Sequence, residues 1–278
     1  MSALHSAIEH TWLPTLPLSD GSDEAAKDTS LSIQQLCHEA MQCSMGGVCV
    51  RPVHIQEAAL ALGQSTVRLV SVAGFPKQKT PIANAIATGW GQAPLAEKLA
   101  DAEAAIHFGA QEIDWVINTA VFAQEWQNAA NQPANWLQTK AEWQTARAAV
   151  FPHPLKLILE TSLWSAKQIE SLCQLASTLV AENPQGKLFI KTCTGYLTDC
   201  TGATPEVIAL IQEALGDFYP DCIGIKASGG IKTHAQAMAL LAAGATRLGT
   251  SSGVSLLKAN VVESCLSISS DDKRAATY

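Results

Sequence analysis

The chain has 278 residues, of which 47% are hydrophobic and 15% are charged, and this composition excludes global disorder. The formal net charge of −7 argues against nucleic-acid binding by general electrostatics, and no uninterrupted apolar stretch is long enough to cross a membrane. We therefore expect a globular α/β protein without a nucleic-acid or membrane partner.

Short β-rich runs alternate along the chain with longer amphipathic stretches. The predicted strands are Ala7–Thr11, Val48–Pro52, Val67–Ala73, Glu112–Ile117, Leu155–Glu160, Leu188–Thr192, Cys222–Lys226 and Thr246–Gly249. The predicted helices are Leu31–Met45, Ile82–Phe108, Ala120–Val150, Ala166–Glu182, Pro205–Leu215, Thr233–Ala243 and Val254–Leu266. We expect a polar surface loop at Asp20–Thr29 and a polar tail over residues 267–278.

Several helix ends carry recognisable signals. Thr204-Pro205-Glu206 reads as an N-cap, a proline in the first turn and an acid that favours the helix dipole. Thr233 is expected to cap the next helix, and Gly109 and Gly244 stand where glycines end helices.

Eight β/α repeats in about 250 residues predict a TIM (β/α)8 barrel. The alternation implies parallel strands joined by right-handed crossovers. A doubly wound open sheet is the main alternative, but no GxGxxG motif follows the first strand. We expect one domain, residues 1–266, followed by the tail at 267–278.

In TIM barrels the active site lies at the C-terminal ends of the strands. Four ionisable residues stand near such ends, namely Asp114, Glu160, Lys191 and Lys226. The two-residue period of a strand places Asp114 on the face opposite Ile113 and Trp115, and therefore towards the barrel axis.

Lys191 and Lys226 end neighbouring strands, so their charges repel. At ~4 Å and an effective dielectric constant of ~20, this repulsion is about 4 kcal/mol, enough to lower the pKa of one lysine by roughly 3 units. A neutral amine is what a Schiff-base nucleophile needs, and Asp114 would serve as a proton shuttle. Taken singly, each lysine also fits a strand-end side chain that extends to water, and Asp114 fits a salt bridge to either one.

Two glycine- and serine-rich loops follow the last two strands. They contain Ser228-Gly229-Gly230 and Gly249-Thr250-Ser251-Ser252-Gly253. TIM barrels commonly bind phosphate with these loops and a helix N-terminus, although small residues also make tight turns. The cluster therefore points to a phosphorylated substrate.

These motifs together resemble deoxyribose-phosphate aldolases, the class I (Schiff-base) aldolase family. The stretches that carry the resemblance are Lys191-Thr192-Cys193-Thr194-Gly195, Glu112-Ile113-Asp114, residues 224–231 from Gly224 to Ile231, Phe75-Pro76, residues 155–161, residues 203–206 and Gly249-Thr250-Ser251-Ser252. They occur in order, and the resemblance covers nearly the whole chain from about Glu9 onward.

The resemblance implies reversible cleavage of 2-deoxy-D-ribose 5-phosphate to D-glyceraldehyde 3-phosphate and acetaldehyde, in deoxyribonucleotide and carbohydrate catabolism, without a cofactor or a metal. It implies that Lys191 forms the Schiff base, that Lys226 perturbs it and that Asp114 relays protons. It also implies substrate contacts from Thr11, Cys49 and Thr194, phosphate contacts from Gly229, Gly230, Ser251 and Ser252, and proton transfer by the terminal Tyr278.

The chain departs from the family pattern at two positions. Glu9 replaces an aspartate, and Tyr196 stands where some members carry lysine and others phenylalanine. A lysine there would contact phosphate, so its absence predicts weaker affinity for the phosphorylated substrate.

Two alternatives stay open: a Schiff-base aldolase acting on another sugar phosphate, and a non-catalytic barrel that binds sugar phosphates. A metal-dependent aldolase is disfavoured, since the seven histidines form no HExxH motif. The eight cysteines include no CxxC pair and fit reduced thiols. No secretory signal is visible, so we expect a cytoplasmic protein, and a homodimer is the expected assembly.

Overall fold

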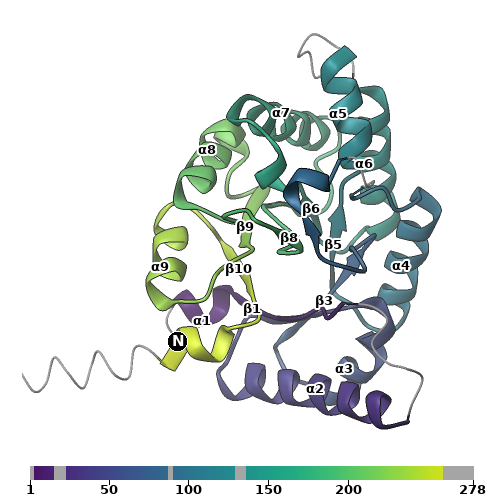
Figure 1. The fold of residues 1–278 in the computed structure, drawn as a ribbon, viewed down its shortest axis with the longest axis vertical. Helices are drawn as coiled ribbons and strands as arrows, with labels where there is room; N and C mark the ends of the chain where they lie inside the picture. Colours follow the sequence, from purple (N-terminus) through teal and green to yellow (C-terminus); the bar gives the residue numbers. More distant parts are fainter. Residues whose placement is uncertain (1–2, 16–22, 87–89, 129–135, 259–278) are drawn as a thin grey trace, which may run out of the picture.

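The computed structural model describes residues 3–15, 23–86, 90–128 and 136–258. Eight parallel strands close into a barrel in the order β1-β10-β9-β7-β6-β5-β3-β2, and helices surround it (Figure 1). The strand-to-strand pairing of β1 with β10 completes the ring. The predicted TIM barrel is therefore confirmed.

All eight predicted strands are present in the barrel. They are β1 (Ile8–Trp12), β2 (Gly47–Val50), β3 (Arg68–Ala73), β5 (Glu112–Val116), β6 (Leu155–Ile158), β7 (Leu188–Lys191), β9 (Ile223–Ser228) and β10 (Arg247–Thr250). Two short strands that were not predicted, β4 (Thr80–Pro81) and β8 (Leu197–Thr198), pair with each other above the barrel's C-terminal end.

The helices are α1 (Ala3–Ala7), α2 (Asp23–Gln42), α3 (Ile55–Leu62), α4 (Leu95–His107), α5 (Thr119–Asn128), α6 (Leu137–Val150), α7 (Ala166–Glu182), α8 (Pro205–Leu215) and α9 (His234–Ala242). Short 3-10 turns lie at Pro52–His54, Ile82–Asn84, Thr161–Leu163 and Gly216–Phe218. Residues 253–258 are helical, and the rest of the helix predicted at Val254–Leu266 lies outside the described residues. Thr204 and Thr233 cap α8 and α9 through their side chains, as predicted.

Three predicted boundaries were wrong. The single helix at Ile82–Phe108 is instead a 3-10 turn followed by α4, because Pro94 and the positive φ of Gly91 (72°) prevent a continuous helix. The stretch Ala120–Val150 is divided into α5 and α6. The loop predicted at Asp20–Thr29 is helical from Asp23, where acids in the first turn precede good helix formers.

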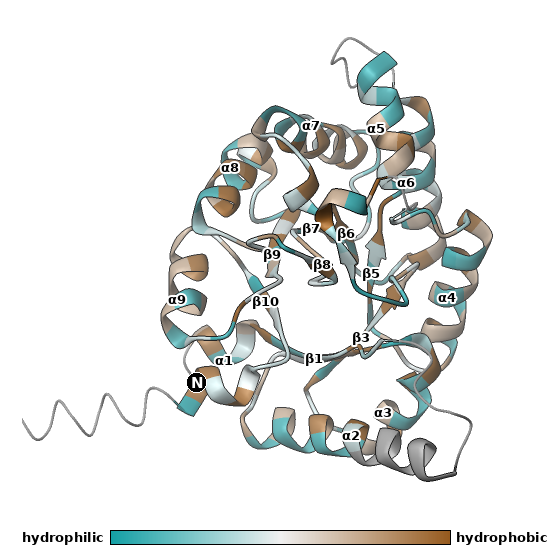
Figure 2. Ribbon diagram, in the orientation of Figure 1, coloured by the Kyte–Doolittle hydropathy of each residue, from teal (hydrophilic) through white to brown (hydrophobic). Residues whose placement is uncertain are grey.

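The apolar residues form two separate clusters. Ile113, Trp115 and Ile117 belong to the larger one, between the strands and the helices, where amphipathic helices present their apolar sides (Figure 2). The smaller cluster includes Cys49 and Val116 from the inner face of the barrel, which confirms the predicted phase of β5. In the described part of the chain, no helix is both long enough and apolar enough to cross a membrane.

Candidate active site

The C-terminal ends of β7 and β9 place two lysines side by side. Lys191 and Lys226 are direct register partners, so the barrel's own hydrogen bonding fixes their spacing. Asp114 on β5 lies between them: its Oδ2 accepts from Lys191 Nζ at 2.7 Å and from Lys226 Nζ at 2.6 Å. The sum of these distances limits the separation of the two nitrogens to 5.3 Å. The predicted trio is thus brought together, with a carboxylate between the two cations.

A third lysine that was not predicted completes the buried cluster. Lys156 on β6 donates to the other oxygen of Asp114 at 2.9 Å, and its Nζ forms an ion pair with Glu112 Oε2 at 2.7 Å. Glu9 on β1 pairs with Lys226 and lies 3.6 Å from Lys156. Charges in a low-dielectric interior are tolerated only when paired in this way.

The ionic contacts continue towards the opposite end of the barrel. Arg68 and Arg247 begin β3 and β10, so they lie at the N-terminal ends of the strands. Arg68 Nε is 3.2 Å from Glu112, and Arg247 Nε is 3.5 Å from Glu9. A continuous column of paired charges therefore connects the catalytic end of the barrel with its far rim.

The cluster fixes the charges of its members. Burial alone would raise the pKa of Asp114, but the ammonium groups of Lys156, Lys191 and Lys226 outweigh burial and hold that pKa well below its ordinary value. For Lys226, burial would lower the pKa, but Asp114 and Glu9 outweigh burial and raise it. In the protein without substrate, Lys226 is therefore a cation and Asp114 a carboxylate near neutral pH.

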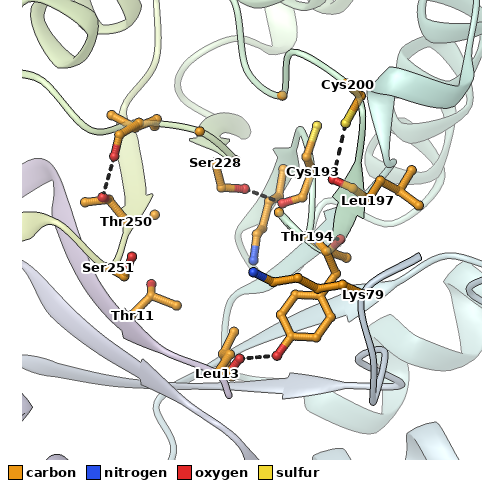
Figure 3. Close-up of a pocket in the computed structure, with 18 of the residues that line it drawn as sticks. Thr11, Leu13, Lys79, Cys193, Thr194, Leu197, Cys200, Ser228, Thr250 and Ser251 are labelled. Carbon is orange, nitrogen blue, oxygen red and sulfur yellow. Dashed lines mark hydrogen bonds between the residues drawn. The ribbon is translucent and has the colours of Figure 1, made fainter. Parts of the chain in front are cut away.

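A cavity of about 610 Å³ opens above these strand ends. Its walls come from the loops after β1, β3, β7, β9 and β10, and Figure 3 shows their side chains converging on it. Of the three clustered lysines, Lys191 is the one that lines the cavity, whereas Lys156 and Lys226 are completely buried beneath it. Geometry thus singles out Lys191 as the amine that a substrate can reach.

The residues predicted to bind phosphate all line this cavity. Gly229 and Gly230 have φ values of 96° and 76°, which glycine adopts without strain, and the Gly229 carbonyl accepts from the Ala203 amide at 3.1 Å. Ser251 and Ser252 immediately precede the helix at residues 253–258. The structure therefore gathers the two predicted loops on one side of the cavity.

Thr194 also lines the cavity, and a buried acid holds its loop in place. Its hydroxyl donates to Glu160 at 2.6 Å, and its backbone N–H donates to the same carboxyl group at 3.1 Å. Burial raises the pKa of Glu160, which stands at the end of β6 with a left-handed φ of 57°. The sequence placed Glu160 at the end of a predicted strand but indicated no role for it.

The remaining predicted residues differ in position. Thr11 lines the cavity, and its hydroxyl donates to the Glu9 carbonyl at 3.0 Å. Cys49 is fully buried in the cluster inside the barrel, where burial raises its pKa to about 11. Tyr278 lies outside the described residues.

Tyr196, one of the two departures from the family pattern, lines the cavity, but its hydroxyl group is hydrogen-bonded to the protein backbone. Its hydroxyl donates to the Leu13 carbonyl, and its ring lies 5.0 Å from that of Phe75. Arg51 lies 5.8 Å from the tyrosine ring and donates to the carbonyls of Pro14 and Pro76. Tyr196 therefore closes the wall and carries no charge there.

The buried cluster had a signal in the sequence that was not used. Lys156 stands within the otherwise apolar run Leu155–Ile158, and a lysine there is costly unless it is paired. Its partner Asp114 is its direct neighbour in register. The contribution of Glu112 has no comparable signal, because that residue begins its strand and would ordinarily be exposed.

This arrangement suits chemistry at an amine in a closed, charged pocket. A carbonyl carbon entering the cavity would meet Lys191 with Asp114 already in hydrogen-bonding position. Among the described residues, no group of His, Cys, Asp and Glu is arranged to hold a metal ion.

Known proteins with similar sequences agree with this chemistry. No protein-family model matches the chain. It is 34% identical to the deoxyribose-phosphate aldolase of Mannheimia succiniciproducens over 233 residues, 84% of this chain and 89% of the relative. It is 36% identical to deoxyribose-phosphate aldolase 1 of Cutibacterium acnes over 230 residues, 82% of this chain and 90% of the relative.

A solved structure with a similar fold is also a deoxyribose-phosphate aldolase. The tetrameric deoxyribose-phosphate aldolase of Aeropyrum pernix superposes with a TM-score of 0.64 at 26% identity, over 92% of this chain and 89% of that one. The chain therefore belongs to the deoxyribose-phosphate aldolase family.

Proposed function

We propose that the protein is a lyase that reversibly cleaves 2-deoxy-D-ribose 5-phosphate to D-glyceraldehyde 3-phosphate and acetaldehyde through a Schiff base on Lys191. The observation that carries this assignment is that Lys191 lines the cavity and lies 2.7 Å from a buried carboxylate. Membership of the family supports the choice of substrate.

The reaction begins when the neutral Lys191 amine adds to the aldehyde carbon of the open-chain sugar. Loss of water then gives an imine. Removal of the proton from the C3 hydroxyl breaks the C2–C3 bond and releases glyceraldehyde 3-phosphate, and the electron pair passes into an enamine. Protonation of that enamine carbon and hydrolysis release acetaldehyde and restore Lys191. Asp114 acts as the proton relay within reach of the amine.

The buried column beneath the cavity contains more cations than carboxylates. Its cations are Lys156, Lys191, Lys226, Arg68 and Arg247, and its carboxylates are Glu9, Glu112 and Asp114. Lys226 is its fixed cation beside Lys191, and the mechanism requires the neutral form of the Lys191 amine as nucleophile.

Borohydride trapping tests the proposal directly. The protein is incubated with acetaldehyde, reduced and digested, and the modified peptide is identified by mass spectrometry. We expect the adduct on Lys191, none in a Lys191→Ala variant that remains folded, and full labelling in Lys167→Ala, a control at an exposed lysine that pairs with Glu170. A protein that cleaves the substrate without an adduct at Lys191 would contradict the mechanism.

The same experiment separates the two alternatives. Absence of both adduct and turnover would favour a barrel that only binds sugar phosphates. Faster cleavage of a fructose phosphate than of deoxyribose 5-phosphate would favour an aldolase for another substrate.

Further assignments belong to this proposal. Gly229, Gly230, Ser251 and Ser252 would bind the phosphate, and Thr11, Thr194 and Cys49 the sugar. Tyr278 would assist proton transfer at the acetaldehyde methyl carbon from the tail at 267–278, outside a single domain over 1–266. A Tyr278→Phe variant with undiminished proton exchange at that carbon would remove Tyr278 from the mechanism.

We also propose a cytoplasmic homodimer, although the Aeropyrum relative is a tetramer. Light scattering on the purified protein would decide between these assemblies.

A further inference from the structure

Besides Lys191, two lysines line the cavity: Lys232, which follows the Gly229-Gly230 loop, and Lys79, which precedes β4. The ammonium group of Lys191 forms an ion pair with Asp114. The ammonium group of Lys79 has neither an ion pair nor a hydrogen bond to any residue the structure describes, and its side chain is exposed. Figure 3 shows Lys79 running inward across the cavity towards its centre.

The segment carrying Lys79 is fixed to the residue that departs from the family pattern. The backbone N–H of Thr80 donates to the Tyr196 carbonyl at 3.1 Å. Beyond this bond, Thr80 and Pro81 pair in register with Leu197 and Thr198. The position of Lys79 is therefore set by the same loop in which Tyr196 replaces a lysine.

Neither Tyr196 nor Arg51, which contacts the tyrosine ring, presents a cationic group in the cavity wall, since Arg51 is not among the residues that line the cavity. The tyrosine hydroxyl donates a hydrogen bond to the Leu13 carbonyl, and Arg51 donates to two backbone carbonyls. Lys232 supplies a cation beside the Gly229-Gly230 loop, but the loop of Tyr196 supplies none from its side of the cavity, and charge-assisted hydrogen bonds are the strong ones in phosphate recognition.

We propose that Lys79 is a specificity-determining residue that binds the substrate's phosphate group and supplies the charge that Tyr196 lacks. The proposal rests on the proposed function, because it assumes that a phosphorylated sugar occupies this cavity. It adds a phosphate contact from the loop after β3, opposite the glycine and serine loops of β9 and β10.

The test compares Lys79→Met and Lys79→Arg with Lys77→Met. Lys77 is a suitable control because it lies two residues away, is exposed and pairs with Glu97 at 3.7 Å. Each variant is assayed with 2-deoxyribose 5-phosphate and with unphosphorylated 2-deoxyribose, and inhibition by inorganic phosphate is measured in parallel.

For Lys79→Met we expect kcat/KM for the phosphorylated substrate to fall about tenfold, chiefly through KM, since binding of a remote group acts on ground state and transition state alike. The inhibition constant of inorganic phosphate should rise by a similar factor. Activity on 2-deoxyribose should change less than twofold, Lys79→Arg should retain most of the discrimination, and Lys77→Met should match the unmodified protein.

Equal losses on both substrates, or unchanged phosphate inhibition, would overturn the role of Lys79. Acetaldehyde trapping on Lys191 needs no phosphate, so it separates the two proposals. If Lys79→Met is trapped normally and prefers the phosphorylated over the unphosphorylated substrate as strongly as the unmodified protein does, only the proposed contact of Lys79 with phosphate is excluded. Failure of trapping in the unmodified protein, while it cleaves the substrate, removes the proposed mechanism instead.

Discussion

Lys156 offers the sharpest test of the buried charge cluster, because it is fully buried and contacts two carboxylates within 3 Å. Lys156→Met keeps most of the side-chain volume and removes the charge. The oxygens of Asp114 and Glu112 that faced the ammonium group then lose their cation. Breaking a buried ion pair from one side typically costs about 3–5 kcal/mol, so we expect a loss of that size in the free energy of unfolding.

Urea unfolding at pH 7 measures this loss, and a fall of about 10 °C in melting temperature should accompany it. Lys140→Met is the matched control: Lys140 Nζ lies 2.6 Å from Glu182 Oε1, but both side chains reach solvent, so the expected change is within about 1 kcal/mol. Equal stability of Lys156→Met and the unmodified protein would refute the assignment of a tightly paired cluster.

The pH dependence gives an independent check. A carboxyl group with a depressed pKa in the folded state contributes stability above its unfolded pKa, and that contribution disappears as the pH falls through the folded pKa. Lys156 is the strongest of the cations that depress the pKa of Asp114. In Lys156→Met the pKa of Asp114 therefore rises, so the folded variant depends less on the ionised form of Asp114. The stability difference between variant and unmodified protein should narrow as the pH falls below about 4, the ordinary pKa of an unfolded aspartate.

Three further outcomes are expected. Asp114→Asn should reduce kcat by about 10² to 10⁴, the range for loss of a general acid–base group, in a protein that remains folded; undiminished turnover would exclude the proton relay. Glu160 has a raised pKa, so it contributes stability below its unfolded pKa that is lost as the pH rises through the folded value; Glu160→Gln should show a flatter stability profile between pH 4 and pH 8 in chemical denaturation. Gly229→Ala would introduce a Cβ 3.1 Å from that of Cys193 at a φ of 96°, so we expect about 1–3 kcal/mol of destabilisation and a higher KM for the phosphorylated substrate; an unchanged KM would place the phosphate elsewhere.

Much of the fold follows from local patterns. The strand phase at Ile113–Val116 separates apolar from polar faces, and the caps at Thr204 and Thr233 mark helix starts that the structure reproduces. The split of the helix after Ile82 was missed because apolar periodicity continues across the glycines and Pro94 that interrupt the backbone.

The sequence predicts residues of the site only where these stand near the ends of predicted strands. Lys191, Lys226 and Asp114 stand at or near the ends of their strands, where a barrel exposes functional groups. The position of the Asp114 carboxylate between the two ammonium groups depends on the register of nonconsecutive pairs and on side-chain reach, which no local pattern encodes. Lys79 was missed for a related reason: its place in the cavity depends on the pairing of two strands that are two residues long.

The line of ion pairs from Arg68 to Lys191 means that the catalytic end is not electrically insulated from the base of the barrel. In a barrel filled only by hydrocarbon layers, substitutions at the base would alter stability and leave reactivity untouched. Here a guanidinium at the opposite rim contributes to the electric field at the Nζ of Lys191, the proposed nucleophile. Evolution can thus adjust the nucleophile from a surface remote from the substrate, while every contact around the sugar stays in place.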